Sequence, residues 1–136
     1  LAFADRSGIF LCAGYVEQLY DSIGDKKKAQ NAMGFSIFHE VGRILLAQWN
    51  HPFAAQKTTA DEFVTVLMTM VSQTQTLSAN AENFIQNPLV SKKLTEAISG
   101  DRHPLTVQRA RRILEWMNDP QFVEASTYMG EQVCGH

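Results

Sequence analysis

The segment 26–49 constrains the fold most, because its apolar residues recur at helical spacing and cover several sides of one long helix. These residues are Ala32, Phe35, Phe38, Ile44, Leu45 and Leu46. A helix that is apolar around much of its circumference has to be covered by neighbouring elements. We therefore expect a helix over residues 26–49 at the centre of the molecule.

The rest of the chain is divided by turn-forming residues into lengths typical of helices. Thr59 and Glu62 have the spacing of a capping box and predict the start of a helix that ends near Thr76 and packs on the central helix as a hairpin. Further helices are expected at 12–23, 80–99 with an interruption near Pro88, 104–118 and 120–129. Residues 1–11 fit two short extended or β segments joined by a turn. The fold class expected is mainly α, in one domain over residues 1–136.

Composition excludes some classes of function. The chain has 136 residues, 45% of them hydrophobic, which suits one domain of roughly 100 to 200 residues. Its net charge of -2 lacks the basic excess of nucleic-acid-binding proteins, so we expect Arg109, Arg111 and Arg112 and the lysines at 26–28 to be solvated. The apolar stretch 63–71 is about half of the ~20 residues that span a bilayer. We expect no nucleic-acid partner and no membrane span.

Polar side chains interrupt the apolar surface of the central helix. They are Ser36, His39, Glu40, Arg43 and Gln48. An ionised group in an apolar setting costs several kcal/mol unless it is paired. Glu40 and Arg43 therefore need an opposite charge, a metal ion or water in a cleft.

The spacing of this cluster matches half of a zinc motif. Residues 39 and 43 are four apart and lie on one helix face, as the two histidines of HExxH do when they bind one zinc ion. The glutamate of that motif activates the metal-bound water, and a further ligand comes from a later segment. Glu40 fits this role, whereas Arg43 stands where the second histidine would be.

Several blocks of the chain resemble one bacterial family, a zincin-like domain of unknown function that is catalogued as metallopeptidases. The family carries HEVGH on one helix, then a proline-containing loop and an acid-rich run that leads into Ala-Asp-x-Phe. The matching residues here are His39, Glu40, Val41, Gly42, Pro52, Ala60, Asp61 and Phe63, with further similarity at 1–5, Leu11, Cys12, Gln108, Arg109, Trp116, Asp119 and Pro120. The resemblance covers nearly the whole chain and implies a single zincin-like domain that lacks the family's leading N-terminal segment.

The chain departs from the family at two expected ligand positions. The second histidine is replaced by Arg43, and the glutamate four residues before Asp61 is replaced by Lys57. Arginine has no lone pair for zinc, and lysine binds a metal only when deprotonated. Residues 41–60 contain no Asp or Glu. We therefore expect a degenerate zinc site, in which these two cations replace the charge of a metal ion beside His39, Glu40 and Asp61.

Three functional interpretations follow. The first is a non-catalytic zincin-like domain without a cofactor that binds a peptide or a protein partner. The alternative is a zinc-dependent peptide hydrolase with Glu40 as general base, His39 as metal ligand, and Asp61 either as a substitute ligand or as a residue that orients His39. A third is a structural module whose cleft is closed by ion pairs. For Asp61, a favourable interaction with the dipole of its own helix is an equal alternative.

Cysteines and the other histidines leave alternatives open. Cys12 and Cys134 form either one disulfide or two buried thiols, and a disulfide would favour an extracytoplasmic or periplasmic location. His51 is expected to be an exposed loop residue, with a replacement metal ligand as the alternative, and His103 and His136 are treated alike.

Overall fold

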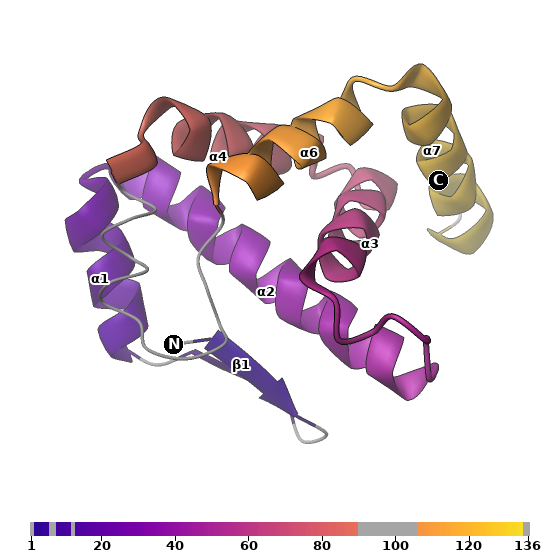
Figure 1. The fold of residues 1–136 in the computed structure, drawn as a ribbon, viewed down its shortest axis with the longest axis horizontal. Coiled ribbons are helices and arrows are strands. Elements are labelled where there is room, and N and C mark those ends of the chain that lie inside the picture. The colour runs from indigo at the N-terminus through magenta and orange to yellow at the C-terminus, as the bar shows by residue number, and fades with distance from the viewer. Residues whose placement is uncertain (1, 6–7, 12, 90–105, 135–136) are drawn as a thin grey trace.

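The protein is mainly helical, as the sequence predicts. The computed structural model describes residues 2–5, 8–11, 13–89 and 106–134, which form a β-hairpin and six helices (Figure 1). The strands are β1 (Ala2–Asp5) and β2 (Gly8–Leu11), and the helices are α1 (Ala13–Ile23), α2 (Lys26–Gln48), α3 (Lys57–Met70), α4 (Thr74–Gln86), α6 (Val107–Met117) and α7 (Pro120–Cys134). The two strands are antiparallel, with Ala2 opposite Leu11. The expected extended segments are thus a hairpin.

Helix α2 is the central element, as predicted. Asp25 caps its first turn by accepting a hydrogen bond from the backbone N–H of Lys28 at 2.9 Å. The helix crosses the molecule and contacts α1, α3, α4 and the hairpin (Figure 1). Because neighbouring elements cover α2 on several sides, apolar residues occur around much of its circumference.

The hydrophobic core lies where α2 meets the other helices. Its largest buried side chains come from different helices: Leu19, Phe35, Val64, Met68, Leu77, Phe84 and Ile113. Burying one such side chain stabilises the fold by about 1.5–3 kcal/mol. This core holds α3 and α6 side by side, and both carry residues of the site described below.

The ends of several helices differ from the predictions. Helix α3 begins at Lys57 and its N-cap Gln56 makes no side-chain capping bond, so the capping box of Thr59 and Glu62 is wrong. It ends at Met70, because Ser72 adopts a left-handed conformation with φ of 60° and a new helix begins at Thr74. Apolar residues on both sides of Ser72 continue the helical spacing, so the sequence pattern does not show that α3 ends here.

The last two helices are also shifted. Helix α6 begins at Val107 rather than at residue 104, and α7 extends to Cys134 rather than ending at Met129. The expected helical residues 90–99 lie outside the described part of the chain. None of the described helices combines the length and apolar character needed to cross a membrane.

Candidate functional site

The most buried charged group of the polar cluster is Asp61 on α3, which is 1% exposed. Arg109 of α6 donates two hydrogen bonds to its carboxylate, from Nε to Oδ2 at 2.6 Å and from Nη2 to Oδ1 at 2.7 Å. This is the two-pronged geometry in which an arginine binds a carboxylate most strongly. Both oxygens of Asp61 are therefore engaged by one guanidinium group.

Arg109 is held in place by the start of its own helix. Thr106 is the N-cap of α6, and its hydroxyl accepts a hydrogen bond from the backbone N–H of Arg109 at 3.2 Å. The next residues on the inner face, Ala110 and Ile113, are fully buried. Arg109 therefore lies at the edge of the buried face and reaches α3.

The prediction that the three arginines of α6 are solvated is wrong for Arg109. Arg111 and Arg112 are exposed, whereas Arg109 lies on the side of the helix that packs on α3. Residues 109 and 113 are four apart and therefore share a helix face. Because Ile113 is apolar, this spacing indicates that Arg109 lies next to the buried face. The acid that Arg109 meets is 48 residues away in the chain, so the partner is not visible in the local pattern.

The environment of Asp61 keeps its carboxyl group ionised. Burial alone raises its pKa, but the hydrogen bonds from Arg109, the neighbouring His39 and the charges of both outweigh burial, so the pKa lies below the ordinary value of 3.8. Asp61 is therefore an anion whose charge is matched by Arg109.

His39 of α2 is the second member of the cluster beside Asp61. Its Nδ1 lies 3.4 Å from Oδ1 of Asp61, and this buried nitrogen makes no hydrogen bond. The distance is longer than an ordinary N–H···O bond, so the two groups are in contact without a hydrogen bond. The ring of His39 also lies 5.9 Å from the ring of Phe35.

The position of Asp61 on its own helix decides one of the alternatives for its role. Asp61 is in the second turn of α3, which excludes the interpretation that it interacts with the dipole at the first turn.

Glu40 and Arg43 form a second, looser pair on α2. Nη1 of Arg43 lies 3.9 Å from Oε1 of Glu40, with the glutamate buried and the arginine partly exposed. A long pair with one exposed partner contributes little to stability. Arg43 therefore accompanies Glu40, and the cation that binds Asp61 is Arg109. The side chain of Lys57, the other predicted cation, lies outside the described residues.

Tyr15 and Ser36 extend the polar cluster toward α1, and nothing in the sequence around Tyr15 indicates this contact. The hydroxyl groups of Tyr15 and Ser36 are 2.8 Å apart, and Ser36 also donates to the carbonyl of Ala32. Burial raises the pKa of the Tyr15 phenol, the hydrogen bond with Ser36 lowers it, and the charge of Glu40 raises it, with a net increase above 10.0. The phenol is therefore a neutral partner for Ser36.

Gly42 allows the two helices of the site to approach closely. A Cβ atom at Gly42 would lie 3.1 Å from Cδ1 of Phe63 and 3.1 Å from Cγ2 of Val64. These contacts are tighter than usual, so a side chain at residue 42 would require Phe63 or Val64 to shift by a few tenths of an ångström. The glycine next to His39 and Glu40 in sequence thus keeps His39 within reach of Asp61.

The described residues around His39 can be compared with the ligand set of a zinc ion. A catalytic zinc site needs about three protein ligands and an open position. In the described part of the chain no three His, Cys, Asp or Glu side chains are grouped to hold a metal. His39 and Glu40 remain as donors, but both oxygens of Asp61 accept hydrogen bonds from Arg109. Among the described residues, the charge of Asp61 is therefore balanced by Arg109, and His39 and Glu40 have no third metal ligand beside them.

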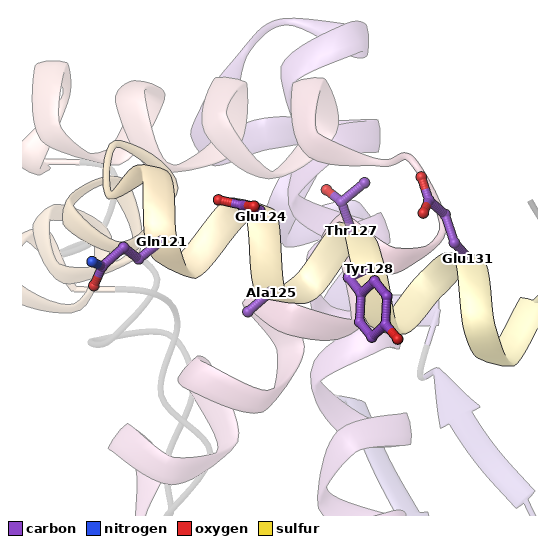
Figure 2. A pocket seen from close by; sticks show the side chains of 6 residues that line it. All are labelled: Gln121, Glu124, Ala125, Thr127, Tyr128 and Glu131. Carbon is purple, nitrogen blue, oxygen red and sulfur yellow. The ribbon is translucent and has the colours of Figure 1, made fainter.

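A surface hollow lies elsewhere, along the outer side of α7. Figure 2 shows the six side chains that line it, all of them on this one helix: Gln121, Glu124, Ala125, Thr127, Tyr128 and Glu131. The opposite side of α7 carries the buried residues Ser126 and Gly130. The hollow includes neither His39, Glu40 nor Asp61, so it does not form a groove at the ion pairs.

The remaining candidate residues are placed as follows. His51 is exposed in the loop after α2, where its Nδ1 accepts a hydrogen bond from the backbone N–H of Phe53 at 3.1 Å. This agrees with the expectation of a loop histidine. His103, His136 and the side chains of Cys12 and Cys134 lie outside the described residues.

No family model, curated protein or solved structure matches the chain. The metallopeptidase resemblance therefore stays a prediction that rests on the residues quoted for it. The Asp61–Arg109 pair joins two of the blocks that carry this resemblance.

Proposed function

We propose that the chain is a zincin-like domain without peptidase activity, which acts as a peptide- or protein-binding module. The observation that carries the proposal is the bidentate pair of Asp61 and Arg109. The guanidinium group occupies one lone pair on each oxygen of Asp61 and balances the negative charge that would otherwise attract a metal ion.

Two further features support a non-catalytic domain. Residue 43 is an arginine, which has no lone pair for zinc at neutral pH, and it lies near the motif glutamate, Glu40, where a metal-bound water would have to be activated. Asp61 of α3 is paired with Arg109 of α6 and is in contact with His39 of α2, so the cluster connects three helices in one scaffold. Rigid scaffolds lose little entropy on binding, which suits a binding module.

The second candidate is the zinc-dependent peptide hydrolase. It is favoured by one observation: Nδ1 of His39 faces the carboxylate of Asp61. In zinc sites a histidine is often oriented in this way by a carboxylate, while its other nitrogen binds the metal. This candidate needs at least two further ligands.

Zinc binding separates the two candidates. We expect the purified chain, equilibrated with zinc and then desalted, to retain substoichiometric metal by elemental analysis and to hydrolyse no casein above the buffer rate. The variant Arg43→His with Arg109→Met would supply a second imidazole and release Asp61, and we expect it to bind zinc at least ~10-fold more tightly. Arg112→His, on the exposed side of α6, is the matched control and should bind as the parent does.

Two results would contradict the non-catalytic proposal. One is stoichiometric zinc in the parent chain that is lost in His39→Ala. The other is casein hydrolysis that zinc restores after chelation. The binding function is tested separately by selection from a displayed random peptide library, where we expect enriched peptides with affinities on the order of micromolar. A library without enrichment would remove this half of the proposal.

A further inference from the structure

The outer side of α7 presents acids beside an exposed tyrosine. Figure 2 shows two rows of side chains along the hollow: Glu124, Thr127 and Glu131 on one edge, and Gln121, Ala125 and Tyr128 on the other. We call these six residues the α7 face. Both glutamates are exposed, and Tyr128 is 61% exposed. The α7 face is therefore accessible to a partner along its whole length.

The charges of the α7 face are negative and are not neutralised within the described ranges. Residues 113–136 contain four acids and no Lys or Arg. In the described part of the chain, neither Glu124 nor Glu131 forms an ion pair. Arg111 and Arg112, which precede this segment on α6, are exposed and are not paired with either acid. The negative potential of the α7 face is thus directed at solvent and attracts cations.

Tyr128 lies between the two glutamates on the helix surface. Glu124 is four residues before it and Glu131 is three residues after it, so both are its neighbours on one side of the helix. The face of a tyrosine ring attracts a cation, and a guanidinium group can stack on such a ring while its N–H groups reach a carboxylate. The three side chains together therefore suit an arginine of a partner.

The spacing of the acids matches that of a helical partner. Glu124 and Glu131 are seven residues apart, which is about 10 Å along a helix axis. Two cations that are seven residues apart on a facing helix have the same separation. Ala125 is the smallest side chain of the α7 face, and beside the large Tyr128 it leaves a groove into which a ridge of side chains can pack.

The form of the hollow also favours a helix over a small molecule. Its volume is about 600 Å³, and the described residues that line it all belong to one helix. Pockets for small ligands surround most of the ligand surface. A hollow that is lined from one side instead accommodates an element that lies across it.

We propose that the α7 face binds a basic helical segment of a protein partner, with an arginine on the Tyr128 ring between Glu124 and Glu131. This inference rests on the binding function proposed above and gives it a surface and a partner class. The negative charge disfavours nucleic acid and anionic membranes, because both present phosphates. It also disfavours a second copy of the chain docked by the same face, because the acids of the two copies would then meet.

Peptide binding to the full chain tests the proposal. The probe is a fluorescein-labelled, alanine-based helical peptide with three arginines on one side, at positions i, i+3 and i+7. We expect fluorescence anisotropy to give a Kd on the order of 10–100 µM at low salt, weakened at least ~10-fold by high salt. A peptide of the same composition, with the arginines distributed around the helix, is the matched probe and should bind at least ~5-fold more weakly.

Variants locate the contact with the same probe. We expect Tyr128→Ser to weaken binding by roughly fivefold, and Glu124→Gln with Glu131→Gln by roughly tenfold. Glu17→Gln with Glu82→Gln is the matched control, because it removes two exposed acids on α1 and α4 and gives the same net charge. The control should bind as the parent does. Far-UV circular dichroism verifies that each variant is folded.

Three outcomes would overturn the proposal. The first is no binding of the arginine peptide, and the second is equal binding of the two peptides. The third is equal loss of binding in the control and in the α7 variants, which would assign the attraction to net charge alone. Library peptides that bind equally well to the parent and to the α7 variants would leave the binding function standing and would reject the α7 face as its site.

Discussion

At the scale of single residues, Asp61 shows how this fold tolerates a buried anion. Removing a carboxylate from water costs several kcal/mol, and the attraction of Arg109 with its two short hydrogen bonds offsets this cost. The net stabilisation by such a pair is small. Removing one partner is expensive, because the other charge is then left in the interior without compensation.

The variant Arg109→Met tests this asymmetry. It leaves Asp61 buried without its main partner, so we expect the free energy of unfolding to fall by about 3 kcal/mol in urea titrations. Arg111→Met, an exposed arginine on the same helix, is the matched control and should change it by less than about 0.5 kcal/mol. Adding Asp61→Leu to Arg109→Met should restore most of the lost stability. Equal stability of the two arginine variants would show that the pair is not structural.

At the scale of elements, a glycine can allow two helices to pack closely, because it has no side chain at the contact. Gly130 of α7 is buried against the end of α3, where an added Cβ atom would lie 2.8 Å from the carbonyl oxygen and 3.1 Å from Cα of Met70. These are backbone atoms, so they cannot rotate away. Gly34 of α2 differs, because its added Cβ would lie 3.6 Å from Cγ2 of Thr76, an ordinary contact.

Alanine substitutions at these two glycines should have opposite effects. Gly130→Ala forces α7 away from α3, and we expect a loss of about 1–3 kcal/mol in the free energy of unfolding. Gly34→Ala fits without a clash and restricts the unfolded chain, so we expect a gain of about 0.5–1 kcal/mol. Thermal and urea denaturation of both variants measure the difference. A Gly130→Ala protein as stable as the parent would contradict the close packing of α7 on α3.

At the scale of the whole molecule, the ion pairs couple its stability to pH. The pKa of Asp61 lies below 3.8 in the folded chain: burial, the largest single influence, raises it, but the combined interactions with Arg109 and His39 lower it by more. A carboxyl group with a lowered folded pKa stabilises the fold fully above its unfolded pKa, and this stabilisation is lost as pH falls through the folded value. The window of loss therefore lies below about pH 4.

Acid unfolding of the parent and of Asp61→Leu with Arg109→Met should reveal this coupling. We expect the free energy of unfolding of the parent to fall more steeply below pH 3.8 than that of the double variant, which has no carboxyl group at this position. Urea titrations at a series of pH values give both curves. Parallel curves over this range would mean that the folded and unfolded pKa values of Asp61 are equal.

Local pattern alone determined much of the architecture. The apolar spacing of residues 26–49 predicted α2 as the central helix, and the extended segments near the N-terminus were also expected. The ends of α3 were missed, because a left-handed turn at Ser72 and an N-cap without a side-chain bond leave no clear signal in the sequence. Arg43 was excluded as a zinc ligand by its chemistry, whatever the fold.

Only the tertiary structure decided which charges meet. The sequence placed His39, Glu40 and Arg43 on one helix and Asp61 on the next, since helical periodicity is a local property. It could not show that Asp61 pairs with Arg109, 48 residues away, because that contact depends on how α6 packs on α3. A buried charge is stabilised by its nearest partner in space, and the packing of the helices determines which residue that is.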